Sequence, residues 1–281
     1  MSRDIHPNDR ENHVPAREPE LGEMRAAVLS REPELRRGRG YICQISDVEL
    51  QTLQDVGRFR TIELRDIERF RYQGDAAKTE QALQSLEAQN LVRRQTLWTG
   101  GRREQLTVLA LTPSGKAVVQ GESRLQHGQA IYSGLVKPAE VGHDAAIYRM
   151  YYAEAEKIAQ AGGRIHRIVL DYELKRHVYS PLAKAKHLPP IDYAQQQSDI
   201  ARQNGLKVIR GKILLPDLRI EYETRDGASA SIDLELATHH YRGSMMRGKA
   251  EAGFKFYASA ESVSHLASAF DPEFAVQIFS F

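Results

Sequence analysis

The segment from Leu214 to Ala237 constrains the fold most, because it has the pattern of two strands joined by a tight turn. Apolar and charged residues alternate on both sides of Arg225-Asp226-Gly227, so each strand has one apolar and one charged face. If these three residues form the loop, with Gly227 in the left-handed conformation, the pairing is symmetric about Asp226 and places Asp217 opposite Glu235. A two-residue loop would shift the pairing by one residue and separate the two carboxylates.

Two facing carboxylates restrict the chemistry of this hairpin. Their Cβ atoms would lie about 5 Å apart, and like charges at that separation destabilise a sheet. A divalent cation, a shared proton or a basic side chain between them removes the repulsion. Two interpretations stay open: a Mg²⁺ or Mn²⁺ site with Asp217 and Glu235 as ligands, or a solvated acidic strand face.

The composition restricts compartment and partners. The 39 Lys and Arg residues nearly balance the 37 Asp and Glu residues, so binding of nucleic acid depends on local basic patches. Cys43 is the only cysteine, which excludes a disulfide framework and a cysteine-based zinc site. No apolar run approaches the roughly 20 residues that span a bilayer, and the N-terminus lacks the apolar core of a signal peptide. We expect a soluble cytoplasmic protein with no membrane contact.

Residues 1–40 are rich in charge and proline and poor in large apolar side chains. Such a segment buries too little surface to offset its loss of conformational entropy, which predicts a flexible arm. Its arginines at positions 36, 37 and 39 either lie in a solvated linker or contact a phosphate backbone.

Residues 41–125 have the pattern of a winged helix-turn-helix domain. Capping residues and apolar stripes predict helices at 46–56, 61–70 and 74–89, followed by strands at 91–98 and 105–111. This order suits a DNA-binding module whose third helix enters the major groove while the hairpin follows the backbone. A protein-contact module with the same fold is the alternative. The expected DNA-binding residues are Lys78, Arg93, Arg94, Arg102 and Arg103.

After a predicted linker at 126–142, residues 143–281 have the pattern of an αβ domain. We expect helices at 143–161, 191–204 and 242–259, and strands at 164–170 and 274–281 besides the hairpin. Glu154 falls within the apolar stripe of the first helix and Glu156 points away, so Glu154 either forms a buried salt bridge or belongs to a functional site. On the last helix Lys249 borders the inward stripe and Lys255 faces away, which makes Lys249 the lysine expected to reach the sheet.

These residues carry a family resemblance. The span 46–259 resembles the replication-relaxation proteins of plasmids and other mobile elements, through Leu111 to Gly115, His143, Pro216-Asp217, Glu235, and Lys249 with Tyr257. The second half is also similar to the PD-(D/E)xK nuclease-like fold. The resemblance implies an α+β protein, an N-terminal winged helix followed by a nuclease-like αβ domain. It implies a catalytic site made of Glu154, Asp217, Glu235 and a lysine.

One position departs from that pattern. The nuclease pattern has a lysine two residues after Glu235, where this chain has Ala237, and replication-relaxation proteins commonly have an acid there. Lys249 could supply the missing charge. We expect a DNA-binding protein of a mobile element or plasmid that acts in DNA replication, relaxation or mobilisation. It would be either a Mg²⁺- or Mn²⁺-dependent endonuclease or a non-catalytic regulator of replication or transcription. The expected partner is double-stranded DNA, and a homodimer is allowed. A zinc site at His239-His240 is disfavoured, because adjacent strand residues point to opposite faces.

Overall fold

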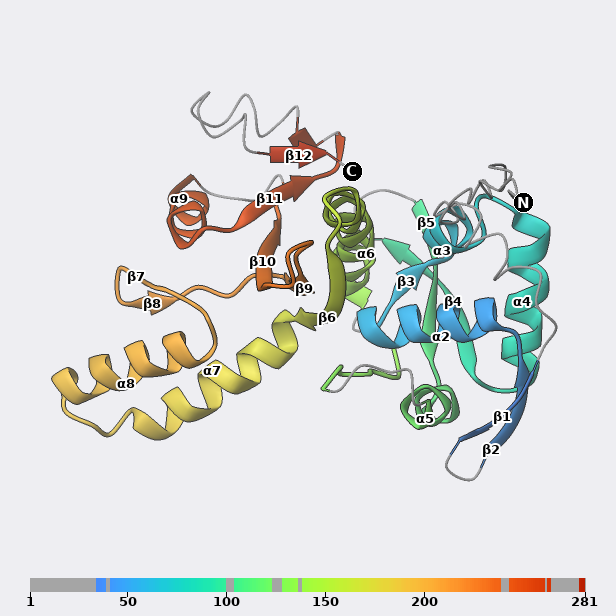
Figure 1. Cartoon of the computed structure of the whole chain (residues 1–281), viewed down its shortest axis with the longest axis horizontal. Coiled ribbons are helices and arrows are strands. Elements are labelled where there is room, and N and C mark those ends of the chain that lie inside the picture. The colour runs from blue at the N-terminus through green and yellow to red at the C-terminus, as the bar shows by residue number, and fades with distance from the viewer. Residues whose placement is uncertain are drawn as a thin grey trace, which may run out of the picture.

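The chain is a mixed α+β protein in which one long helix lies between two halves (Figure 1). The computed structural model describes residues 34–38, 41–99, 104–122, 128–135, 138–238, 243–260, 262–263 and 278–280. The long helix, α6 (Pro138–Gln160), separates an N-terminal half rich in helices from a C-terminal half built on a five-stranded sheet. Within the described residues, no helix is long and apolar enough to cross a membrane.

The N-terminal half contains the helices that the sequence predicts. Ser46 and Glu49 form a reciprocal capping box at the start of α2 (Asp47–Phe59), and Asp75 caps α4 (Ala76–Ala88). The helix between them, α3 (Leu64–Arg71), begins later than predicted, because β3 (Ile62–Glu63) is extended and pairs with β5 (Glu104–Leu111). β5 also pairs with β4 (Val92–Thr99), which gives a sheet of order β3-β5-β4.

The segment from Leu111 to Gly115 has a steric role. Thr112 caps α5 (Pro113–Gly121) by accepting a hydrogen bond from Gly115 N at 3.0 Å. A Cβ atom on Gly115 would lie 1.9 Å from the carbonyl oxygen of Leu91. Glycine is therefore required for the close approach of α5 to the start of β4.

The N-terminal boundary differs from the prediction. β1 (Glu34–Gly38) pairs antiparallel with β2 (Tyr41–Ile45), so a strand begins inside the segment predicted as a flexible arm. Cys43 and Ile45 are buried, and this apolar anchor favours pairing over a solvated chain. Residues 1–33 and 39–40 lie outside the described part of the chain.

The described part of the predicted linker contacts both halves of the chain. Tyr132 N donates to Gly57 O at 2.7 Å, and the Gln129 side chain makes hydrogen bonds of 3.0 Å to both backbone groups of Ile168 in the sheet. Ile131 is buried between these contacts. α6 begins at Pro138, earlier than predicted, since proline suits the first turn of a helix.

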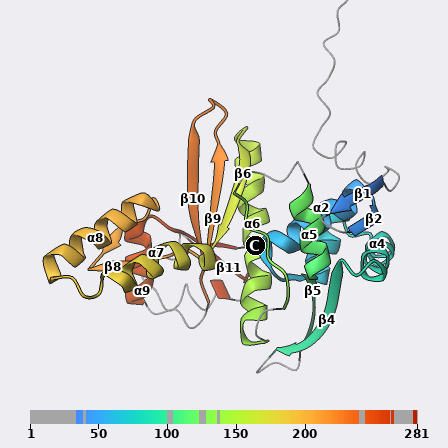
Figure 2. The same ribbon diagram turned by 90° about the horizontal axis from the view of Figure 1, so that it is seen from below.

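The C-terminal sheet has the order β12-β11-β10-β9-β6. Its strands are β6 (Arg164–Leu170), β9 (Leu218–Glu223), β10 (Ser229–Leu236), β11 (Lys255–Ala258) and β12 (Ile278–Ser280). β6, β9 and β10 pair antiparallel, whereas β11 is parallel to β10 and to β12. Figure 2 shows β6, β9 and β10 side by side, with α6 next to β6.

α6 joins both halves into one apolar core. Ile147 and Ile158 belong to the same buried cluster as Leu218 and Leu234 of the sheet, and that cluster continues to Leu53 of α2. The rings of Phe59 and Tyr148 meet edge to face with centroids 5.0 Å apart. A contiguous core of this kind restricts movement between the halves.

The other side of the sheet has helices of its own. α7 (Asp171–Ala185), which the sequence did not predict, and α8 (Pro190–Gln203), which it did, form a small core with the strands β7 (Val208–Ile209) and β8 (Lys212–Ile213). α9 (Gly243–Ala252) ends before Gly253, whose φ is 96°. The predicted continuation of this helix to residue 259 is therefore wrong, because residues 255–258 form β11.

Candidate functional site

The hairpin of β9 and β10 has the predicted register. Leu218 lies opposite Leu234, and the three-residue loop 225–227 is closed by Thr224 N donating to Ala228 O at 2.8 Å. Gly227 has a φ of 80°, the left-handed conformation that this loop requires. The regular pairing ends at Leu218 and Leu234, and Asp217 N donates to Leu234 O at 3.1 Å. The Asp217 carboxylate lies close enough to Glu235 for its charge to raise the pKa of Glu235.

Lys249 reaches this carboxylate pair from α9, as the sequence predicts. Its Nζ atom donates a hydrogen bond to Glu235 Oε1 and forms an ion pair with it. The side chain of Glu235 is 1% exposed and that of Lys249 is 13% exposed. A charged group that is buried to this extent needs a partner, and Lys249 provides one.

Asp217 lies beside a second basic side chain, His143, which is the first residue of the expected nuclease-like domain. Its Oδ2 atom accepts a hydrogen bond from Leu236 N at 2.9 Å and lies 3.6 Å from His143 Nε2. The other ring nitrogen of His143 lies 3.5 Å from Asp144 Oδ1. Asp144 and Asp217 raise the pKa of His143 to about 10, so the imidazole is a cation at neutral pH.

Burial favours the protonated form of both carboxylates, but the net pKa shifts of Asp217 and Glu235 have opposite signs. For Asp217 burial opposes ionisation, but the hydrogen bond and charge of His143 outweigh it, and the pKa is lowered. For Glu235 burial and the charge of Asp217 raise the pKa to about 8, although Lys249 acts in the other direction. His143 therefore compensates the charge of Asp217, whereas Glu235, with a pKa of about 8, keeps its proton at neutral pH and so avoids repulsion by Asp217.

The protein's own cations stand beside the two carboxylates that were predicted to hold a divalent ion. Over the described residues, no group of three or more His, Cys, Asp or Glu side chains is placed to hold a metal. Mg²⁺ or Mn²⁺ would have to displace Lys249 or His143 to bind between Asp217 and Glu235. The residues of the disfavoured zinc site, His239 and His240, lie outside the described residues.

Glu154 is buried, as predicted, but it faces another part of the sheet. Its carboxylate lies 2.7 Å from Lys255 Nζ and accepts a hydrogen bond from the Tyr257 hydroxyl. Lys255 and Tyr257 are register partners of Leu234 and Leu236, so they lie on the sheet face opposite Glu235. The structure therefore does not bring Glu154 to the carboxylate pair. Lys255 was expected to face away because the sequence pattern placed it on a helix.

The predicted DNA-binding residues have different surroundings. Lys78 is 60% exposed and lies 3.2 Å from Asp75, and Arg93 is exposed on β4. Arg94 is 24% exposed and donates hydrogen bonds to both Glu80 and Glu87 of α4, so its guanidinium links β4 to α4. Its expected role as a phosphate contact conflicts with this engagement. Arg102 and Arg103 lie outside the described residues.

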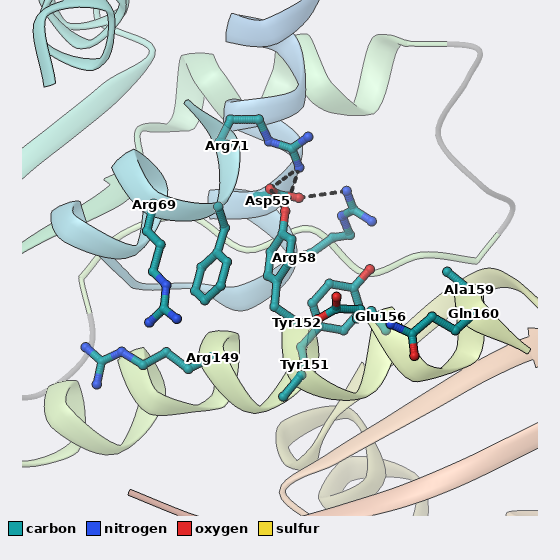
Figure 3. A pocket seen from close by; sticks show the side chains of 13 residues that line it. Asp55, Arg58, Arg69, Arg71, Arg149, Tyr151, Tyr152, Glu156, Ala159 and Gln160 are labelled. Atoms are coloured by element: carbon teal, nitrogen blue, oxygen red, sulfur yellow. Dashed lines mark hydrogen bonds and ion pairs between the residues drawn. The ribbon is translucent and has the colours of Figure 1, made fainter. Parts of the chain in front are cut away.

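A polar cluster that the sequence did not predict lies between α2, α3 and α6. Asp55, 2% exposed, accepts hydrogen bonds from Arg58 at 3.0 Å, from Arg71 and from the Tyr148 hydroxyl at 2.8 Å. Figure 3 shows Asp55 between the two arginines. Burial opposes its ionisation, but Arg71 and Arg58 outweigh burial and lower its pKa.

A further ion pair connects α6 to α3 of the N-terminal half. Arg149 of α6 donates to both carboxylate oxygens of Asp66 at 2.8 Å and also to Glu63. Arg149 lines one side of a cleft of about 700 Å³, to which Arg58 and Arg71 also contribute (Figure 3). Arg58 and Arg71 pair with Asp55 within the N-terminal half, whereas Arg149 pairs with Asp66 and so connects α6 to that half.

Comparisons of the sequence with protein-family models and with curated proteins, and of the structure with solved structures, gave no match.

Proposed function

We propose that this chain is a DNA-binding protein of a mobile element or plasmid that acts in DNA replication, relaxation or mobilisation. The observation that carries the proposal is the order α2, β3, α3, α4 and then the β4–β5 hairpin, which is the order of a winged helix. In that fold α4 is the helix that enters the major groove.

The outer face of α4 suits base contacts better than phosphate contacts. Gln81 and Gln84 are exposed there, and a glutamine amide can form a bidentate pair with adenine. The acidic Glu80 and Glu87 are turned toward Arg94, which reduces their repulsion of a phosphate backbone. Sequence selectivity should therefore depend strongly on the two glutamines.

In this proposal the sheet half supports DNA binding and does not cut DNA. Both carboxylates of the nuclease-like site are matched by cations of the protein itself, Lys249 and His143. Ala237 is buried where the nuclease pattern has lysine. The sheet is joined through α6 to the helices that bind DNA, so it can hold them in place.

A metal-dependent endonuclease is the second candidate, and a specific contact favours it. Asp217, Glu235 and Lys249 come together on one face of the sheet, which is the set of groups that such an enzyme requires. This candidate needs a divalent ion to replace the protein's own cations at the two carboxylates.

Two experiments test these candidates on the full chain. DNA affinity is measured across a salt series for wild type, for Gln81→Ala with Gln84→Ala, and for Arg102→Ala with Arg103→Ala. We expect the glutamine variant to lose selectivity and the arginine variant to show a smaller salt slope, whereas a wild type without salt-dependent binding would refute DNA binding.

The second experiment separates regulator from nuclease. Melting temperature is measured with and without Mg²⁺ or Mn²⁺, and supercoiled and linear DNA are incubated with the protein. No metal-dependent rise in melting temperature and no nicking are expected of the regulator. A rise that Glu235→Ala abolishes, together with nicking, would establish the nuclease.

A further inference from the structure

Trp98 is a large aromatic side chain left in solvent. It is the only tryptophan of the chain, it lies near the end of β4, and it is 66% exposed. A tryptophan contributes to stability mainly by burying its ring, so an exposed one contributes little to the fold. Its placement relative to α4 indicates what it contacts.

Trp98 lies on the face of the β4–β5 hairpin that meets α4. Side chains of a strand alternate between faces, so Arg94, Thr96 and Trp98 share one face. Arg94 on that face is bound to Glu80 and Glu87 of α4. Trp98 follows four residues, or about 13 Å, further along the strand. Figure 2 shows that β4 extends away from α4 toward its far end. A nucleic acid that extends from α4 along this face of the hairpin would also reach Trp98.

The opposite face of the hairpin is fixed to α6. Leu97 and Leu106 pack with the buried Val108 and with Val141 of α6. This apolar contact holds the strand from behind, so Trp98 is presented on a supported surface.

The neighbours of Trp98 favour a nucleic acid over a protein partner. Gln105 is its exposed register partner, and the next pair is Thr96 with Thr107, whose hydroxyls lie 3.1 Å apart. A protein interface of any stability surrounds its central aromatic with other apolar side chains. A lone aromatic among hydroxyl and amide groups instead suits stacking on a base, with hydrogen bonds to the neighbouring sugar and phosphate.

We infer that Trp98 stacks on an unpaired base beside the duplex held by α4. The preferred ligand is then DNA with a junction between paired and single-stranded segments, because the bases of intact duplex are already stacked on each other. This inference rests on the proposed DNA binding and adds the class of DNA. Loss of one stacked base corresponds to a decrease in affinity of about 5- to 150-fold.

Trp98 itself reports on the contact. Forked DNA and a fully paired duplex of the same sequence are titrated into the full chain while tryptophan fluorescence is recorded. We expect the fork to quench the fluorescence and to bind more tightly than the duplex. Trp98→Ala should lose the preference for the fork, Trp98→Phe should keep most of it, and Tyr179→Ala, an exposed aromatic on α7, is the matched control.

The outcomes separate this inference from the proposed function. Equal loss of fork and duplex affinity in Trp98→Ala, or fluorescence that stays unchanged at saturating fork, would overturn the stacking contact while DNA binding stands. A wild type that binds neither DNA refutes the proposed function itself. A change of molecular mass in Trp98→Ala, measured by sedimentation, would assign Trp98 to self-association and also overturn the inference.

Discussion

Replacing Arg149 by methionine tests whether buried ion pairs hold α6 against the N-terminal half. The guanidinium makes two hydrogen bonds of 2.8 Å to Asp66 and one to Glu63, whose side chains are 6% and 9% exposed. Methionine keeps most of the apolar stem of Arg149, so the substitution mainly removes charge and hydrogen bonds. Two buried carboxylates then lose their common partner.

The structure sets the size of the effect. Breaking a buried ion pair destabilises a protein by about 3–5 kcal/mol. Asp66 can avoid the full loss by taking up a proton, at about 1.36 kcal/mol for each pH unit above its unfolded pKa of about 3.9. Because Asp66 can take up a proton, its contribution to the loss of stability is at most about 4 kcal/mol at pH 7 and about 1.5 kcal/mol at pH 5. Burial already raises the pKa of Asp66 although Arg149 lowers it, so removing Arg149 raises it further.

We therefore expect Arg149→Met to lose about 3 kcal/mol at pH 7, a melting temperature lower by roughly 5–10 °C, and clearly less at pH 5. Thermal unfolding at both pH values measures this. Arg202→Met is the control, because Arg202 is 79% exposed in its pair with Asp199 and should change stability by less than about 1 kcal/mol. Adding Asp66→Asn to Arg149→Met should recover part of the loss.

Two results would refute this reasoning. One is a melting temperature for Arg149→Met equal to that of Arg202→Met at pH 7. The other is a loss of the same size at pH 5 and pH 7, which would mean that the buried carboxylates do not take up protons and that only packing has changed.

Three further predictions concern the site and the fold. The stability of Glu235→Gln relative to wild type should increase between about pH 5 and pH 8. The pKa of Glu235 is raised to about 8 in the folded protein, so the protonated side chain stabilises the wild type at low pH and this stabilisation is lost as pH rises to about 8. Urea unfolding across this range measures the difference, and a constant difference would contradict the prediction. His143→Gln should lower the free energy of unfolding below about pH 6.5, and the loss should shrink as pH rises toward 10, because the carboxylate partners of His143 raise its pKa. Parallel stability profiles for wild type and variant would argue against the ion pair with Asp217. Gly115→Ala should destabilise by about 1–3 kcal/mol because its Cβ would meet the Leu91 carbonyl, and a wild-type urea midpoint would disprove the close approach.

The sequence alone determined the features that depend on neighbouring residues. Alternation of apolar and charged side chains, with a glycine that tolerates a positive φ, was enough to predict the register that pairs Leu218 with Leu234 and brings Asp217 near Glu235. Capping residues likewise marked where α2 and α4 begin. Helical periodicity also indicated that Glu154 is buried and Glu156 is exposed.

The tertiary structure decided which charges meet. Glu154 lies 11 positions after His143, about 16 Å along α6, and it faces the side of the sheet that carries Lys255. Periodicity shows that a side chain is buried, but it does not show which strand lies over it. The strand at 255–258 reads as helix in the sequence because its partners β10 and β12 are distant in the chain.

The same limit applies to the carboxylate pair. Its facing geometry follows from a local turn, whereas the cations that match it come from the start of α6 and from α9. Hydrogen bonds within a turn are fixed by a few consecutive residues, but an ion pair between distant elements depends on how the whole chain packs. The sequence therefore predicted two facing acids and the approach of Lys249, and only the fold brought His143 to Asp217 and separated Glu154 from both acids.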